Sequence, residues 1–143
     1  MSTDSQSLNP ISSYDLGAIL LPSPVDPADA PRVSYAVTPG ANLGGLEIND
    51  VGFPVRADLY GSLYGATAFP FTMYPELDPY RAFYPIDTLS GMSGGPIYTR
   101  DASGHLLVRA VHTSIYNGAG SALRITEGLA FLIQAWVNEV GGG

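Results

Sequence analysis

The chain has 143 residues, enough for one domain, and 45% of them are hydrophobic, which can fill a core and argues against global disorder. Six basic and thirteen acidic residues give a net charge of −7. Such an acidic surface repels phosphate backbones, so we expect no nucleic-acid partner. The absence of cysteine excludes a disulfide scaffold and thiolate chemistry. No apolar run is long enough to span a membrane, and the first residues do not read as a signal peptide, so we expect no membrane partner.

The first 32 residues divide into an arm, a short apolar run and a linker. Residues 1–21 comprise a small polar arm followed, from residue 14, by an apolar run typical of a buried strand. Residues 22–32 contain four prolines and predict an extended linker, because proline does not fit inside a helix or a central strand. The linker separates this first strand from a main body over residues 33–143.

The main body alternates short strand-like runs with turn residues. Seventeen glycines, twelve prolines and nine tyrosines favour turns and short strands over long helices. The expected strand segments are residues 33–37, 46–53, 59–69, 81–88, 96–100, 106–115 and 121–125. Strands at this spacing predict an all-β fold, an antiparallel sandwich or barrel.

The last segment changes from strand to helical spacing. Its apolar residues fall on one face of a helix at Leu129, Leu132, Ile133, Trp136 and Val140. Thr126 can cap the start of this helix, and the closing glycines end it. We expect one C-terminal helix packed against the β body.

The motif with the clearest chemical meaning is Gly-Met-Ser-Gly-Gly-Pro at residues 91–96. Glycines let the backbone turn tightly and bring N–H groups close to a reacting carbonyl, while they leave the Ser93 hydroxyl open to a substrate. An ordinary turn between two strands could have the same sequence pattern. A nucleophile elbow shares the Gly-x-Ser-x-Gly pattern, but it needs a following helix, and residues 96–98 are strand-like.

The motif and its surroundings resemble a trypsin-like serine protease. The stretch at 91–96 is similar to that family's nucleophile signature, and residues 108–113 follow as its expected next strand. The Val-Gly-Phe-Pro step at 51–54 resembles the bacterial glutamyl endopeptidase branch. Residues 14–19 look like the strand that carries the family's catalytic aspartate. The resemblance implies a six-stranded antiparallel β-barrel, the second barrel of such a protease, with a C-terminal helix.

The resemblance also implies roles for individual residues. Ser93 matches the nucleophile, Asp15 matches the acid that orients a histidine, and the N–H groups of Gly91 and Ser93 match the oxyanion hole.

The same resemblance implies a primary specificity pocket. Thr88 matches its floor, and His112, with Thr113 beside it, matches the wall where glutamyl endopeptidases place a histidine. A protonated or hydrogen-bonding imidazole could receive an acidic side chain there. A buried strand histidine satisfied by its neighbours is the other interpretation of His112.

Two departures from the family pattern stand out. Met92 occupies a position where trypsin has an aspartate that pairs with a newly cut N-terminus, so that route of activation is excluded. No histidine precedes Asp15, although the family's general base precedes its aspartate. His105 belongs to a predicted turn and His112 to the pocket, so neither matches the base, and a serine without a base is a weak nucleophile.

We therefore expect a serine endopeptidase, or its serine-bearing part, that needs a histidine from elsewhere, such as a separate first-barrel chain. The alternative is a catalytically inactive β-barrel that binds peptides. Partners would be a peptide or protein substrate, and the exposed barrel face would favour self-association. The resemblance implies a secreted or extracellular location. No cofactor or metal is expected, because Asp26 with Asp29, and Glu76 with Asp78, lack the spacing of a calcium loop.

Overall fold

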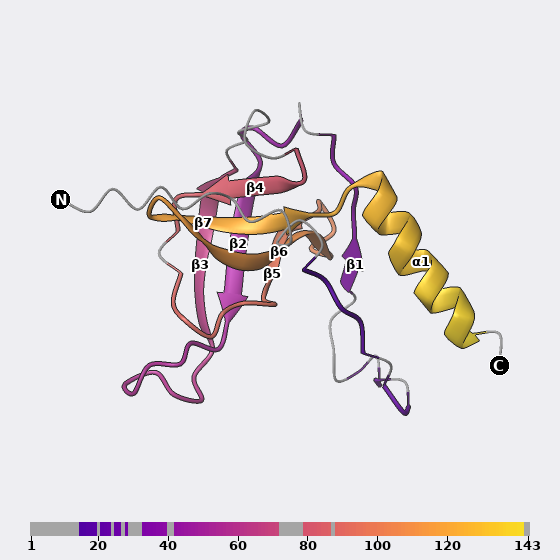
Figure 1. The fold of residues 1–143 in the computed structure, drawn as a ribbon, viewed down its shortest axis with the longest axis horizontal. Coiled ribbons are helices and arrows are strands. Elements are labelled where there is room, and N and C mark those ends of the chain that lie inside the picture. Colours follow the sequence, from indigo (N-terminus) through magenta and orange to yellow (C-terminus); the bar gives the residue numbers. More distant parts are fainter. Residues whose placement is uncertain are drawn as a thin grey trace.

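The computed structural model describes residues 15–19, 21–23, 25–26, 28, 33–39, 42–71, 79–86 and 88–141. Within these residues the chain forms seven strands and one helix (Figure 1). They are β1 (Val33–Tyr35), β2 (Glu47–Gly52), β3 (Tyr64–Pro70), β4 (Arg81–Tyr84), β5 (Pro96–Arg100), β6 (Leu106–Tyr116), β7 (Ala119–Arg124) and α1 (Glu127–Gly141).

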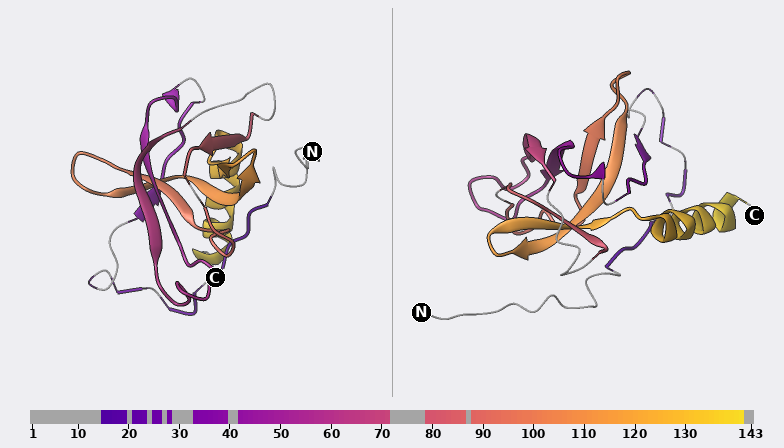
Figure 2. Two further views of the ribbon diagram at one scale, coloured as in Figure 1. Left: turned by 90° about the vertical axis from the view of Figure 1, so that its left-hand side faces the viewer. Right: turned by 90° about the horizontal axis from the view of Figure 1, so that it is seen from above.

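Six of these strands form one antiparallel path in the order β3-β2-β5-β6-β7-β4. The sheet curls strongly, so that its strands cross at steep angles when it is viewed from the side (Figure 2). This architecture, with one helix at the C-terminal end, confirms the predicted all-β barrel class.

Two segments before β2 differ from the prediction. β1 does not join the antiparallel path but runs parallel to the first part of β6, with Val33 opposite Leu106. It reaches β6 there because β7 pairs only with the later part of that long strand, from Ala110 onward. The strand expected over residues 14–21 is absent at residues 15–19, which pair with no strand among the described residues.

The core lies on the inner face of the curled sheet and follows the two-residue alternation of its strands. In β2 the side chains of Ile48 and Asp50 point inward. The buried apolar cluster consists of Leu43, Ile48, Phe71, Ala82, Tyr84, Ile86, Ile97, Ala110 and Ala122. One inward position therefore carries a carboxyl group among aliphatic and aromatic side chains.

Two predicted turns join the strands that position the site. Between β5 and β6, the Asp101 carboxylate accepts hydrogen bonds from the N–H groups of Ser103 at 2.8 Å and His105 at 3.0 Å. Between β6 and β7, Asn117 and Gly118 both have positive φ, 49° and 80°, as a two-residue hairpin turn requires. These turns fix the register of β6 against both of its antiparallel neighbours.

The C-terminal helix is capped as predicted, since the Leu129 N–H donates to Thr126 Oγ1 at 3.3 Å. It packs against the sheet less completely than expected and projects away from it (Figures 1 and 2). Phe131 is 78% exposed and Val137 is 57% exposed. The helix is amphipathic in sequence, but much of its apolar surface has no cover from the described residues. No helix in the described part of the chain is long and apolar enough to cross a bilayer.

Candidate functional site

The loop at residues 91–95 is built on glycines because its backbone conformation and its neighbours leave no room for side chains. Gly91 has a φ of 95° and Gly94 a φ of 88°, a region that other residues avoid. A Cβ atom at Gly91 would lie 2.6 Å from Val55 Cγ2 and 2.9 Å from the Phe53 carbonyl oxygen. The loop therefore needs glycine at 91 for two independent reasons, conformation and close approach of the 53–55 segment.

Backbone hydrogen bonds fix this loop between two parts of the fold. On one side, the Val55 N–H donates to the Ser90 carbonyl at 2.6 Å. On the other, the Gly94 N–H donates to the His112 carbonyl at 2.8 Å, and the His112 N–H donates to the Gly95 carbonyl at 2.9 Å. The loop is thereby attached to β6 at a buried residue.

Met92 is the apolar anchor of the loop. Its side chain is buried in the core, and its sulfur accepts a hydrogen bond from the Leu89 N–H at 3.4 Å. Gly52 packs against it so closely that an added Cβ would lie 3.0 Å from Met92 Cβ. The position that departs from trypsin is thus held by burial, without an ion pair.

The loop presents an exposed hydroxyl and two open N–H groups. Ser93 is exposed, and its Oγ donates to the Thr113 carbonyl at 3.3 Å. Neither the Gly91 nor the Ser93 N–H has an acceptor among the described residues. A cleft of about 310 Å³ adjoins the loop, lined also by Val51, Gly52, Phe53 and Leu63. Two adjacent N–H donors beside a hydroxyl are the arrangement that binds an oxyanion at an acyl-transfer site.

No described contact places a general base at Ser93. The chain has two histidines, and each contacts other groups. His105 Nδ1 lies in the β5–β6 turn, 3.1 Å from Ser103 Oγ and 3.4 Å from Asp101 Oδ2. His112 is buried, with Nδ1 2.5 Å from the Tyr84 hydroxyl. Asp15 is exposed and makes no hydrogen bond with the described residues.

Of the predicted pocket residues, His112 and Thr113 lie on β6 and Thr88 precedes the serine loop, and none of them lines the cleft beside Ser93. Thr113 follows His112 on β6, and its hydroxyl donates to the Ser121 carbonyl at 3.2 Å and accepts from Arg81 Nη2 at 2.9 Å. Thr88 is buried, and its hydroxyl has no partner among the described residues. A buried hydroxyl without a partner costs free energy.

Sequence reasoning missed the polar side chains buried behind the loop. Asp50, Tyr84 and Arg81 are each about 1% exposed. Arg81 donates to the hydroxyls of Ser121 and Ser114. The alternation of β2 could have revealed Asp50, because it shares its parity with buried Ile48.

Burial shifts the pKa values of these groups in opposite directions. Desolvation raises the pKa of Asp50 from 3.8 to about 6, although the Val51 N–H and the Tyr84 hydroxyl favour its ionised form. Desolvation, helped by the charge of Arg81, lowers the pKa of His112 from 6.5 to about 4. His112 is therefore neutral near pH 7 and would act in a pocket as a hydrogen-bonding group, not as a cation.

Other predicted features lie elsewhere or outside the described residues. Asp29, Glu76 and Asp78 are not among the residues that the structure describes. The Asp26 carboxylate accepts a hydrogen bond from the Ala28 N–H at 2.8 Å, which is a local turn. The described residues hold no group of three or more His, Asp or Glu side chains suited to a metal ion.

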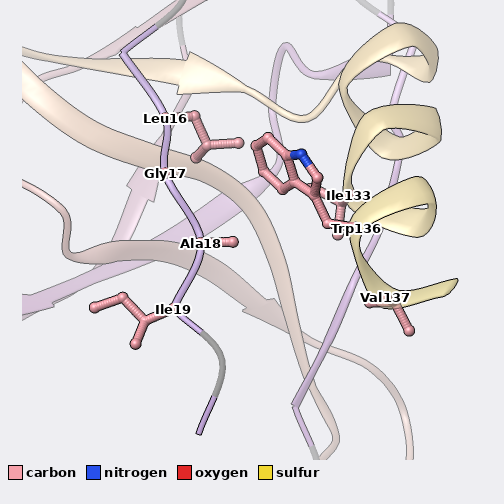
Figure 3. A pocket seen from close by; sticks show the side chains of 7 residues that line it. All are labelled: Leu16, Gly17, Ala18, Ile19, Ile133, Trp136 and Val137. Atoms are coloured by element: carbon pink, nitrogen blue, oxygen red, sulfur yellow. The ribbon is translucent and has the colours of Figure 1, made fainter. Parts of the chain in front are cut away.

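An apolar groove lies away from Ser93, between residues 16–19 and α1 (Figure 3). Its volume is about 370 Å³. The Trp136 indole and the Leu16 side chain point toward one another across it, and Ile133 and Val137 complete the helix side. The groove contains no nucleophile or titratable side chain, so it carries none of the chemistry of the serine loop.

Comparison with known proteins finds similarity among solved structures. No family model matches the chain, and no curated protein does. A solved structure of a Glu endopeptidase in complex with MPD is similar, with a TM-score of 0.55 and 24% sequence identity. The match covers 71% of this chain and 46% of that one, so the chain spans less than half the length of the protein it resembles. The likeness shows a trypsin-like β-barrel fold.

We predict that Gly91→Ala destabilises the protein more than Gly104→Ala. Both glycines have positive φ, 95° and 84°, so both substitutions carry a similar conformational cost. Only Gly91 is also crowded, whereas Gly104 has open space around it. The difference in free energy of unfolding should be about 1–3 kcal/mol, which is the usual cost of overpacking, measured by chemical denaturation. Equal losses would show that the 53–55 segment does not hold the loop.

We also predict an unusual pH dependence of stability. Asp50, whose folded pKa is raised, contributes stability below pH 4 that is lost as pH rises to about 6. His112, whose folded pKa is lowered, contributes stability that is gained between about pH 4 and 6.5. The two slopes oppose each other, so the native protein should show nearly constant stability across this window.

Asp50→Asn should remove the Asp50 contribution to the pH dependence of stability and keep the His112 contribution. The free energy of unfolding should then rise between pH 4 and 6.5 by an amount on the order of 3 kcal/mol, measured by urea denaturation. Asp58→Asn is the matched control, since Asp58 is exposed and its pKa is lowered to about 2, outside the window. If the free energy of unfolding of Asp50→Asn changed with pH as it does in the native protein, the two contributions would not oppose each other.

Proposed function

We propose that this chain is the serine-bearing part of a serine endopeptidase, with Ser93 as its nucleophile. The observation that carries the proposal is the loop at 91–95, where an exposed hydroxyl stands beside two N–H groups without acceptors among the described residues. The trypsin-like fold supports it, because that fold supplies this loop to a peptide-cleaving site in the family that the sequence resembles.

The chemistry assigned to the chain is acyl transfer. Ser93 Oγ attacks the scissile carbonyl carbon and gives up its proton to a general base, and the N–H groups of Gly91 and Ser93 bind the resulting oxyanion. The base returns the proton to the leaving amine, and water then hydrolyses the ester on Ser93. Asp15 is the proposed acid that orients the base.

The base is a histidine that these 143 residues do not supply. Tyr84 occupies one ring nitrogen of His112, and His105 lies in a hairpin turn with Asp101. The proposed partner is a separate first-barrel chain that carries a histidine. Without that partner, the remaining oxyanion and binding effects leave activity several orders of magnitude below that of a complete triad.

We further propose that the enzyme prefers substrates with acidic side chains. Thr88, His112 and Thr113 are the residues proposed to line the primary pocket. In this proposal the Thr88 hydroxyl donates to a substrate carboxylate, and neutral His112 adds a hydrogen bond when its Nε2 carries a proton. Buried Arg81 lies behind Thr113 and contributes a positive charge to the region.

A non-catalytic peptide-binding barrel is the second candidate function. One observation favours it: the Ser93 hydroxyl donates to the Thr113 carbonyl, so it already has an acceptor that is not a base. In this role the open N–H groups of the loop would bind a peptide carbonyl or carboxylate without turnover.

A fluorophosphonate probe separates these functions. We expect the purified chain to label slowly, and labelling to accelerate when free imidazole or a histidine-bearing first-barrel polypeptide supplies the base. Ser93→Ala should abolish the label, and Ser62→Ala, which changes an exposed serine in another loop, should retain it. Absence of labelling under all of these conditions would overturn the endopeptidase proposal and favour the binding module.

A further inference from the structure

Three buried side chains on three different strands form a line that ends at the serine loop. Asp50 lies on β2, Tyr84 on β4 and His112 on β6, and their exposed fractions are 1%, 1% and 3%. The Tyr84 hydroxyl is 2.5 Å from His112 Nδ1. The His112 main chain in turn bonds to Gly94 and Gly95.

The position of Tyr84 between the other two is fixed by packing. Its ring meets His112 edge to face at 6.1 Å between centroids, and it lies directly over Gly120 of the neighbouring strand. A side chain at 120 would collide with the ring, so Gly120 is what lets the Tyr84 hydroxyl reach the interior.

Asp50 is the member of the line whose hydrogen bonds are incomplete. Neither of its oxygens meets full hydrogen-bond geometry with a described residue, although the Tyr84 hydroxyl is near enough to favour its ionised form. A buried carboxyl in this situation either holds a proton or draws the nearest donor to itself. The Tyr84 hydroxyl is the side-chain donor that acts on Asp50 among the described residues.

We propose that Asp50 is a positioning residue that determines, through the Tyr84 hydroxyl, which ring nitrogen of His112 carries the proton. A tyrosine hydroxyl has one proton and can donate in only one direction at a time. Neutral histidine likewise carries one ring proton, on Nδ1 or on Nε2. The protonation state of Asp50 therefore sets the direction in which Tyr84 donates, and this direction sets the tautomer of His112.

The two states differ by one proton on Asp50. When Asp50 is protonated, its O–H donates to the Tyr84 oxygen, the Tyr84 O–H donates to His112 Nδ1, and the imidazole proton resides on Nε2. When Asp50 is ionised, the Tyr84 O–H donates to the carboxylate, and His112 donates its Nδ1–H to the Tyr84 oxygen. Nε2 then presents a lone pair.

The charges around the line allow this exchange. Arg81 on β4 acts electrostatically on both Tyr84 and His112, which disfavours the imidazolium. Burial holds the Tyr84 pKa well above its ordinary value, so the hydroxyl keeps its proton throughout. The Asp50 pKa of about 6 then places the exchange above the His112 pKa of about 4, in a range where the imidazole is neutral.

The consequence for ligand choice rests on the proposed function, in which His112 is a pocket wall. At a pH below the one at which Asp50 loses its proton, Nε2–H is a donor and suits a substrate carboxylate. Above that pH, the Nε2 lone pair repels a carboxylate and suits a donor such as a carboxamide N–H. Preference for glutamate over glutamine would therefore fall as pH rises through the Asp50 transition.

The test is ¹⁵N NMR of the full chain with ¹⁵N-labelled histidine, recorded from about pH 4.5 to pH 8. The two ring nitrogens of His112 should exchange their protonated and unprotonated ¹⁵N shifts as pH rises. Asp50→Asn should abolish this pH dependence, and Tyr84→Phe should uncouple His112 from Asp50. His105, exposed in its turn, is an internal control whose ring ¹⁵N signals should be the same in the native chain and in these variants.

Two results would overturn the proposal. One is a His112 tautomer that stays the same across the whole range in the native chain, which needs no variant to fold. The other is an Asp50→Asn spectrum that switches as the native one does.

A second measurement separates this proposal from the pocket assignment. Binding of short peptides ending in glutamate or glutamine is compared across the same pH range, in the native chain and in Asp50→Asn. We expect the glutamate-to-glutamine affinity ratio to fall as pH rises in the native chain only. A tautomer switch with no change in this ratio would remove His112 from the pocket and leave the role of Asp50 intact.

Discussion

The reciprocal hydrogen bonds between the His112 main chain and the Gly94–Gly95 segment are the interaction on which the site depends. They join the serine loop to the one strand, β6, that pairs with β5, β7 and β1. Because β6 is held on both sides, the loop inherits the rigidity of the sheet, whereas a free glycine-rich loop would sample many conformations. The open N–H groups of Gly91 and Ser93 are useful only if they are held in place in this way.

The site also depends on two buried titratable groups behind the loop whose pKa values are shifted in opposite directions. Asp50 and His112 have pKa values shifted toward each other's ordinary range, and Tyr84 stands next to both. Each group alone would make the free energy of unfolding depend steeply on pH in the acid range, whereas the two dependences together offset one another. The same arrangement links proton occupancy in the core to the hydrogen-bonding character of a residue beside the serine.

Much of the fold could be predicted because it depends on local rules. The Asn117-Gly118 turn, the Asp101 turn and the Thr126 cap each follow from the chemistry of one or two residues. The parallel pairing of β1 and the absence of a strand at residues 15–19 could not be predicted, because they depend on which edges remain open after folding. For the site, the glycine motif identified Ser93, but only the assembled strands bring Asp50, Tyr84 and His112 together across more than sixty positions of sequence.

Hydrogen exchange at the amides of Gly94 and His112 tests the central claim most directly. If their reciprocal bonds attach the loop to β6, both amides should exchange only through global unfolding, with an opening free energy equal to that from denaturation. The Gly104 amide, bonded to the Asp101 carbonyl in an exposed turn, provides the reference for local opening. Exchange of Gly94 or His112 as fast as that of Gly104 would contradict the account.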